Sequence, residues 1–225
     1  MNILIVLSSI GQIPGTDRKT GSWYEEVAAP YYAFRDAGAT VTLASPAGGA
    51  APIDPASEDD GFQTDATRRF SADADAKAAL AATVRLADIK AEDYAAVFYS
   101  GGLGPVFDLA QDETSTALIE AFNGADKPVA AVCHGVAALR QTKGADGQPL
   151  VSGRAVTGFS NSEEAAAHGT GLVPFLIEDE MKRLGGDYSS GADWHAHVVA
   201  DRGLITGQNP ASSDGAAHKL LEALK

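Results

Sequence analysis

The residues of this sequence best suited to chemistry are Cys133, His134 and Gly135, which directly follow the apolar run 128–132. Such a run is typical of a strand buried on both faces of a parallel sheet. The next residues, 136–139, are small, apolar and compatible with a helix. A strand that turns sharply into a helix lifts a nucleophile above the sheet edge, and Gly135 leaves room for that turn. The sequence therefore predicts a nucleophilic thiol at Cys133.

The predicted position of Cys133 also suggests how the thiol is activated. At a helix N-terminus the partial positive charge favours the thiolate. The N–H of His134 is free to hold an oxyanion. Most free cysteines are small buried hydrophobic residues, but the turn, the adjacent histidine and the following glycine favour a reactive thiol here.

Two further groups are expected near this thiol. Gly101 and Gly102 follow another apolar run, and their N–H groups suit the second half of an oxyanion hole, although they are equally typical of a turn. Glu25 and Glu26 lie on a predicted helix, and Glu26 points one step away from Glu25. If Glu26 points inward it needs a partner or a proton, and a protonated carboxyl group beside sulfur could shuttle protons to a substrate carbon.

The remaining candidates are weaker. Glu163 and Glu164 are most simply the start of a helix, and only a contact with the His134 imidazole would make one of them functional. His195 and His197 have the alternate spacing of a strand, but two ligands without a third are weak support for a metal, so we predict no metal site.

The elements around these residues alternate between strands and helices. We expect buried strands at residues 2–7, 40–44, 94–99, 128–132 and 154–159, a hairpin formed by 198–200 and 204–206, and helices at 22–37, 73–84, 114–122, 162–167, 174–184 and 210–224. Ser22 to Glu25 match a capping box, and Pro30 should end or kink the first helix. Residues 45–72 contain few large apolar side chains, which predicts a functional excursion or surface flap.

This pattern predicts an α/β fold with a mostly parallel sheet between helices, in one flavodoxin-like, doubly wound domain over residues 1–225. In such a fold ligands bind outside the carboxyl ends of the strands. The loop 8–21, Gly101 and Cys133 should therefore meet at one edge of the sheet.

Composition excludes several classes of function. The formal net charge of −13 argues against nucleic acid as a partner and favours a small neutral substrate. No apolar stretch approaches the roughly 20 residues needed to span a membrane, and residues 1–7 lack the basic flank of a signal peptide. A single cysteine cannot form an internal disulfide, so we expect a reducing, cytoplasmic location.

Five segments together resemble the ThiJ/PfpI superfamily, and more narrowly its small glyoxalase-III-like branch, which includes stress-inducible chaperone-like members. They occur in the family's order over nearly the whole chain: Lys19–Pro30, Ser100–Gly104, Ala131–Gly135, Thr157–Glu164 and Thr206–Ser212.

The resemblance implies a role for each candidate residue. Cys133 would be the nucleophile, His134 the base and Glu26 the acidic residue beside the sulfur. Glu164, with Glu163 as the alternative, would orient His134, and the family's Gly-Gly turn falls on Gly101 and Gly102. The related glutamine amidotransferases use a His-x-Glu pair, and the segment around His195 and His197 lacks the carboxylate, which disfavours ammonia release from glutamine.

We therefore expect a cofactor-independent glyoxalase, a lyase of the D-lactate dehydratase type, that converts methylglyoxal or glyoxal to a hydroxy acid through a Cys133 hemithioacetal. The resemblance also implies removal of early glycation adducts from proteins, and a homodimer. Two alternatives stay open: a redox-sensing or holdase stress protein whose Cys133 is oxidised, and a cysteine hydrolase acting on peptides or amides.

Overall fold

The computed structural model describes residues 1–225 and contains one seven-stranded sheet with the order β3-β2-β1-β4-β5-β9-β8. All strand pairs are parallel except the pair β8–β9. The strands of this sheet are β1 (Asn2–Val6), β2 (Thr40–Ser45), β3 (Val84–Arg85), β4 (Ala96–Tyr99), β5 (Val129–Val132), β8 (Val198–Asp201) and β9 (Leu204–Gly207). The expected α/β fold with a mostly parallel sheet is confirmed.

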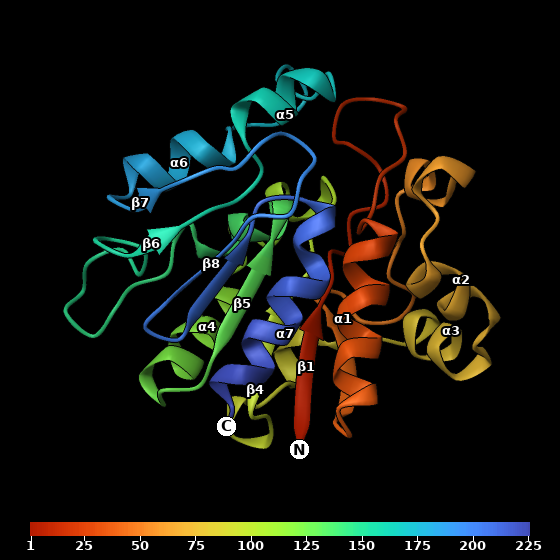
Figure 1. The fold of residues 1–225 in the computed structure, drawn as a ribbon, viewed down its shortest axis with the longest axis horizontal. Helices are drawn as coiled ribbons and strands as arrows, with labels where there is room; N and C mark the ends of the chain where they lie inside the picture. Colours follow the sequence, from red (N-terminus) through yellow and green to blue (C-terminus); the bar gives the residue numbers. More distant parts are fainter.

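Helices cover both faces of this sheet (Figure 1). The helices are α1 (Tyr24–Asp36), α2 (Asp65–Ala72), α3 (Ala74–Ala81), α4 (Glu113–Gly124), α5 (Asn161–Ala166), α6 (Ile177–Arg183) and α7 (Ser213–Ala223). On one face, α1 and α7 pack against each other and against Ile5 and Phe98 of the sheet. On the other face, Leu4 and Val97 lie in a core that α4 covers, and α6 packs on the segment 133–139 at the side of this core. Each strand of the central sheet alternates its side chains between these two cores, which is why the strands read as continuous apolar runs.

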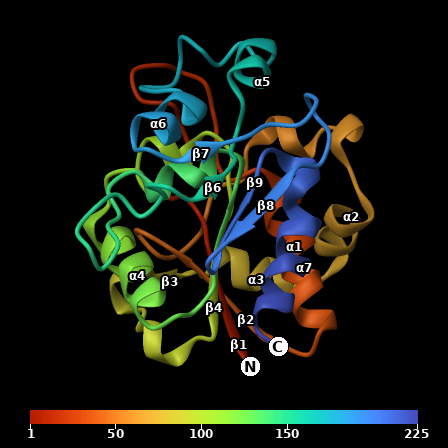
Figure 2. The ribbon, with the colours of Figure 1, turned by 60° about the vertical axis from the view of Figure 1, so that its left-hand side comes forward.

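The carboxyl ends of the parallel strands point away from the two chain termini, which lie at the opposite end of the molecule (Figure 2). The segment with α5 and the loop that follows β1 lie above these carboxyl ends (Figure 1). The chain that leaves β1 crosses to β2 on one side, whereas β4 lies on the other side of β1. A reversal of this kind opens a crevice between neighbouring loops, which is the usual ligand site of an open α/β sheet.

The first helix begins differently from our prediction. It starts at Tyr24 after Trp23, without a side-chain cap, so the predicted capping box is wrong. The Ser22 hydroxyl group instead accepts a hydrogen bond from the N–H of Ser8, and the Glu25 carboxylate accepts one from Thr64. Both partners are distant in sequence, and these tertiary contacts replace the local cap.

Pro30 lies inside α1, which continues for 13 residues as one helix, so of the two predicted effects, an end or a kink, the end does not occur. A proline removes one helical hydrogen bond. The residues around it, from Glu26 to Tyr32, are all buried. Burial of the helix between the sheet and α7 outweighs the local preference for a break.

The segment of residues 45–72 is not a featureless loop. It contains the 3₁₀ turns Pro55–Glu58 and Asp60–Phe62 and then α2. Asp54 and Thr64 cap the first turn and α2 through their side-chain oxygens. The low apolar content of this segment predicted only an excursion or surface flap. The caps and short turns give it a defined structure. Its turns lie beside the loop that follows β1 (Figure 1).

The predicted strand at residues 154–159 is only partly correct. Just Ala155–Val156 (β6) is a strand, and it pairs with Asp187–Tyr188 (β7) in a separate two-stranded sheet. The N–H of Thr157 donates to the Thr206 hydroxyl group, so the chain leaves the two-stranded sheet there and crosses one face of the main sheet at β9. This crossing carries the chain toward α5 above the main sheet.

No helix in the structure combines the length and the apolar character needed to cross a membrane.

Candidate active site

Cys133 occupies the sharp turn that the sequence predicts. Its φ of +55° is in the left-handed region, which non-glycine residues rarely adopt. β5 ends at Val132, and a 3₁₀ helix, Cys133–Leu139, follows immediately. A Cβ atom at Gly135 would lie 2.6 Å from the carbonyl oxygen of Ser100, so only glycine allows this close approach. Such strain is typical of a nucleophile held in place by the surrounding fold.

Cys133, His134 and Glu164 form a connected series. Sγ of Cys133 lies 3.4 Å from Nδ1 of His134, and Nε2 of His134 lies 2.7 Å from Oε2 of Glu164. All three side chains are buried. A carboxylate at Nε2 keeps the proton on that nitrogen and leaves Nδ1 free to accept the thiol proton. Glu164, which the sequence could not separate from Glu163, is thus the residue in contact with His134.

Glu26 points inward, which is the orientation in which a carboxyl group needs a partner or a proton. Its side chain is fully buried, and its Oε2 accepts a hydrogen bond of 2.6 Å from the N–H of Gly101. Oε1 has no hydrogen-bond partner among nitrogen and oxygen atoms, and the Cys133 side chain faces the carboxyl group. Burial raises the pKa of Glu26 to about 8, which is only partly opposed by its contacts with Cys133 and Gly101. The carboxyl group is therefore mainly protonated at neutral pH.

The thiol is less acidic than its place at a helix start suggested. Burial raises the pKa of Cys133, and negative charge on Glu26 raises it further. The backbone N–H groups of His134 and Gly102 act in the opposite direction, because they donate to the sulfur. In the resting site the thiol therefore keeps its proton, and the thiolate forms as His134 removes it.

Of the N–H groups that we expected to stabilise an oxyanion, those of Gly101, Gly102 and His134, only two are available. The N–H of Gly101 is occupied by Glu26, so it is not available to a substrate oxygen. The N–H groups of Gly102 and His134 both point toward the sulfur. These two donors, one after β4 and one after β5, can stabilise negative charge that develops next to Cys133.

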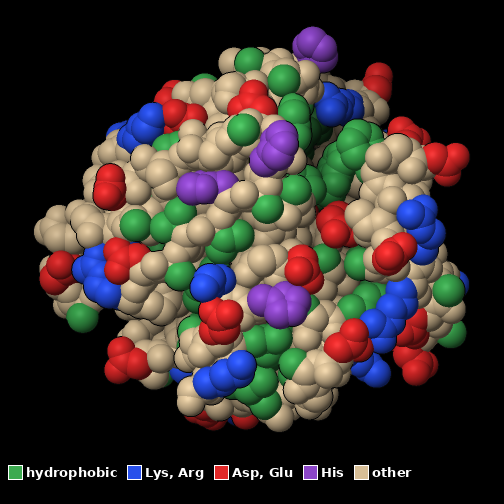
Figure 3. Space-filling view, in the orientation of Figure 1, with side chains coloured by type: hydrophobic (Ala, Val, Ile, Leu, Met, Phe, Trp, Pro, Cys, Tyr) green, Lys and Arg blue, Asp and Glu red, His purple; other side chains and the backbone are tan.

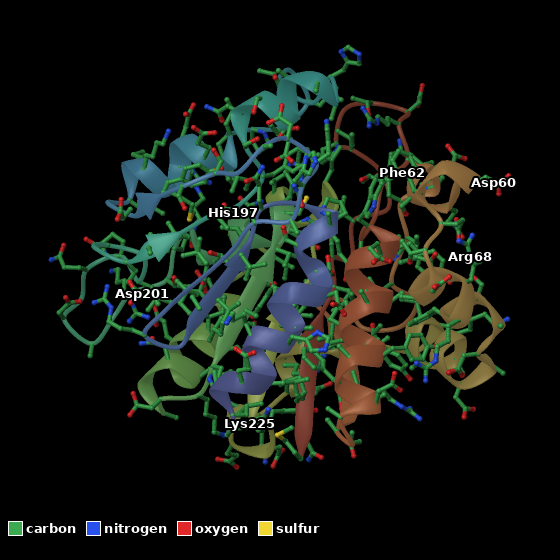
Figure 4. All side chains as sticks on the ribbon, viewed as in Figure 1. Asp60, Phe62, Arg68, His197, Asp201 and Lys225 are labelled. Carbon is green, nitrogen blue, oxygen red and sulfur yellow. The ribbon has the colours of Figure 1, made fainter.

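A cavity of about 520 Å³ opens onto Cys133, His134 and Glu164. Its walls include aromatic side chains from four different segments, and neither their role nor their meeting was predicted: Trp23, Phe62, Phe159 and Trp194. Phe62 and Asp54 come from the segment 45–72, so this segment forms part of the cavity wall. Phe62 lies on the inner side of that segment and Asp60 on its outer side (Figure 4). The surface is hollowed beside this segment, and hydrophobic side chains line the hollow (Figure 3).

The aromatic walls form two pairs. The rings of Trp23 and Phe62 meet edge to face with centroids 5.1 Å apart. Phe159 lies 4.4 Å from the His134 ring and 5.8 Å from the Trp194 ring. Edge-to-face pairs at these distances are favourable. Trp23 and Phe62 are 39 positions apart in the sequence, and Phe159 and Trp194 are 35 apart, so no local pattern could have revealed these pairs.

The other histidines take no part in this site. His197 contacts the Ser189 hydroxyl group at 3.0 Å, and the His195 ring lies beside the carbonyl oxygen of Asp193. His168 and His218 are exposed. No group of three or more histidine, cysteine, aspartate or glutamate side chains in the chain is arranged to hold a metal ion.

Known proteins resemble this chain along most of its length. It is 29% identical to the glutathione-independent glyoxalase HSP31 of Saccharomyces cerevisiae, over 99% of this chain and 98% of the yeast protein. It is 35% identical to the glutamine amidotransferase-like class 1 domain-containing protein 1 of Bos taurus, over 64% of this chain and 65% of the bovine protein.

Solved structures give the same result. The Rapid Encystment Protein 24 KDa of Francisella tularensis superposes with a TM-score of 0.95 at 32% identity, over 100% of this chain and 99% of that chain. Glyoxalase III of Candida albicans superposes with a TM-score of 0.89 at 24% identity, over 100% and 98% of the two chains, which shows a common fold. The DJ-1/PfpI family matches residues 21–223. The chain therefore belongs to the DJ-1/PfpI family.

Proposed function

We propose that this protein is a cofactor-independent glyoxalase that converts methylglyoxal or glyoxal to the corresponding hydroxy acid. The observation that carries the proposal is the position of one thiol between two proton carriers, with His134 on one side and the buried carboxyl group of Glu26 on the other. The full-length similarity to a yeast glutathione-independent glyoxalase supports it.

The reaction begins with addition of the sulfur to the aldehyde carbon. As the bond between Sγ and carbon forms, Nδ1 of His134 takes the thiol proton, and Glu26 gives its proton to the aldehyde oxygen. The product is a neutral hemithioacetal. The N–H groups of Gly102 and His134 stabilise the negative charge that passes through the oxygen.

The next steps move hydrogen from one carbon to its neighbour. The Glu26 carboxylate takes the proton from the former aldehyde carbon, and imidazolium protonates the ketone oxygen, which gives an enediol. Glu26 then returns its proton to the second carbon, while His134 takes the hydroxyl proton of the first. A thioester results, in which the first carbon is oxidised and the second reduced. Water hydrolyses it and restores the thiol, so no external electron carrier is needed.

Glu164 supports these transfers by stabilising the imidazolium form of His134. The bond of 2.7 Å to Nε2 becomes an ion pair when Nδ1 is protonated. Burial of both side chains keeps water away and strengthens the attraction. Glu164 therefore acts through His134 and does not itself exchange protons with the substrate.

The direct test is incubation of the protein with methylglyoxal in the absence of glutathione, followed by enzymatic measurement of D- and L-lactate. We expect lactate from the intact protein and none from Cys133→Ala purified in the same way. The variant is a matched control for contaminating enzymes, because it differs by one sulfur atom in a small side chain. No lactate from the intact protein would contradict the proposal.

The structure favours this chemistry over the two alternatives. Oxidation of cysteine depends on thiolate character and exposure, but the Cys133 thiol is buried and its pKa is raised. A cavity of about 520 Å³ is within the range of small-molecule sites, which favours a small substrate over the peptide of a cysteine hydrolase. Mass spectrometry of Cys133 after mild peroxide treatment, together with a client-aggregation assay, tests the redox and holdase alternative.

We extend the proposal to removal of early glycation adducts, because the same thiol can add to an aldehyde-derived carbon carried on a side chain. We also propose a cytoplasmic homodimer, as the family resemblance implies. Light scattering of the purified protein measures its mass, and a mass of 23.1 kDa would contradict the dimer.

A further inference from the structure

Glu163 makes an unusual set of contacts for a residue beside the catalytic series. Its side chain is fully buried and accepts five hydrogen bonds, all from neutral donors. Oε2 accepts from the N–H and hydroxyl group of Ser160 and from the amide of Gln208. Oε1 accepts from the N–H of Trp194 and the amide of Asn209, both at 2.8 Å. The capping box at the start of α5 uses only the first of these contacts, the one from the N–H of Ser160.

The contacts of Glu163 join three segments around the cavity. Ser160 precedes α5, Gln208 and Asn209 follow β9, and Trp194 lies in the loop before β8. The Asn209 amide also donates to the carbonyl oxygen of His195 at 2.8 Å, which fixes the same loop a second time. Burying a carboxylate without a cation is costly unless its oxygens are fully hydrogen-bonded. The number of contacts explains how the charge is accommodated here.

Trp194 is held in a backbone conformation that it would not adopt by itself. Its φ is +64°, in the left-handed region, and the hydrogen bond to Glu163 fixes the N–H of that residue. The residue is 50% exposed, and its indole lines the cavity, where it contacts Phe159. A large apolar ring held half in solvent by a strained backbone has a contact surface that the protein core does not use.

We propose that Trp194 is a specificity wall of the cavity and that Glu163 is the positioning residue that holds it there. The inference rests on the proposed glyoxalase function. A cavity of about 520 Å³ is much larger than methylglyoxal needs, because cavities of about 300–1,000 Å³ hold drug-sized ligands. Substituents larger than a methyl group reach the aromatic wall, and the wall selects 2-oxoaldehydes with a flat, apolar substituent.

The first test compares kcat/KM for phenylglyoxal and for methylglyoxal. Because an aromatic contact changes binding by a few-fold to tenfold, we expect Trp194→Ala to lower the ratio of the two values about fivefold, through KM for phenylglyoxal. The kcat/KM for methylglyoxal should fall less, since its methyl group is too small to reach the wall, so the ratio of the two values is the readout. An unchanged ratio would overturn the role of Trp194.

The second test asks whether Glu163 acts through Trp194. Glutamine replaces one of the two acceptor oxygens by an NH₂ group. Whichever way the amide is turned, this NH₂ group faces donors that bond to the Glu163 carboxylate in the wild type. We expect Glu163→Gln to lower the same ratio, and to have no further effect on it when combined with Trp194→Ala. If the effects of Glu163→Gln and Trp194→Ala on the ratio add in the double variant, Glu163 does not act through Trp194 and the proposal is overturned. An equal loss of kcat for both substrates would also overturn it, because Glu163 would then act through Glu164 and His134.

A third measurement does not depend on activity. The chain has two tryptophans, so in Trp23→Phe the fluorescence reports on Trp194 alone. We expect Glu163→Gln in that background to increase quenching by acrylamide, while circular dichroism stays unchanged. Unchanged quenching would overturn the positioning role, even if the protein proved to have no glyoxalase activity. Should Glu163→Gln fail to fold, Asn209→Ala, which removes one of the two contacts to Oε1, takes its place in this measurement.

Discussion

Replacing Glu26 by glutamine should change how the stability of the protein depends on pH. The carboxyl group is fully buried and its pKa rises from 4.5 to about 8. Between these two pH values the folded protein keeps a proton that the unfolded chain has released. The free energy of unfolding of the wild type therefore contains a penalty that grows as the pH rises through this window. A glutamine at the same place does not titrate and carries no such penalty.

The magnitude follows from the pKa shift. Each pH unit within the window changes the free energy of unfolding by about 1.4 kcal/mol, so the difference between Glu26→Gln and the wild type should grow by about 4 kcal/mol from pH 5 to pH 8. Above the pKa of about 8 the difference should level off. The Cys133 thiol adds little in this range, because burial and Glu26 raise its pKa well above the usual value.

The assay is urea denaturation of both proteins at pH 5, 6, 7 and 8, followed by circular dichroism. The result is how the difference in free energy of unfolding between the two proteins varies with pH. A loss of stability from altered packing is the same at every pH, so it does not affect this result. Glu92→Gln, at an exposed site far from Cys133, is the matched control and should show no trend. A constant difference between Glu26→Gln and the wild type would refute the argument that Glu26 is a protonated buried acid.

Three further outcomes follow from the site. First, because Glu26 starts the reaction as an acid, kcat/KM for methylglyoxal should fall as the pH rises through about 8, and a profile measured from pH 5 to 10 that stays flat above pH 8 would contradict this. Second, Gly135→Ala would place a methyl group 2.6 Å from the carbonyl oxygen of Ser100, so it should lower the free energy of unfolding by about 1–3 kcal/mol. Chemical denaturation measures this, and Gly124→Ala, where a Cβ atom meets nothing within 4 Å, is the control that should not be destabilised. Third, Phe62→Ala removes one ring of the Trp23 pair at the cavity, so it should raise KM for phenylglyoxal about two- to tenfold with little change in kcat, and steady-state kinetics that show the reverse would exclude a binding role.

The local parts of the site could be predicted because each depends on a pattern of neighbouring residues. The apolar run before Cys133 and the glycine after His134 predicted the sharp turn, and the structure has it with a φ of +55°. The step from Glu25 to Glu26 around a helix predicted that the two side chains point in different directions, and Glu26 is the one that is fully buried. The order of strands and helices predicted a mostly parallel sheet between helices, which is the sheet observed.

The tertiary structure decided everything that depends on which distant groups meet. It separated Glu164, which contacts His134, from Glu163, which holds Trp194. It assigned the Gly101 N–H to Glu26 and left the Gly102 N–H for the sulfur. Periodicity and capping patterns report only on residues within a few positions of each other, whereas hydrogen bonds and cavity walls form between segments of any separation.

The same limit explains the incorrect expectation for the thiol. The sequence by itself determined that a cysteine stands at the turn between a strand and a helix, where the local backbone favours negative charge. Only the folded structure determined that Cys133 is buried beside Glu26, and both effects raise its pKa. Solvation and charge at a buried site depend on all groups around it, so chain order alone could place the sulfur but not set its acidity.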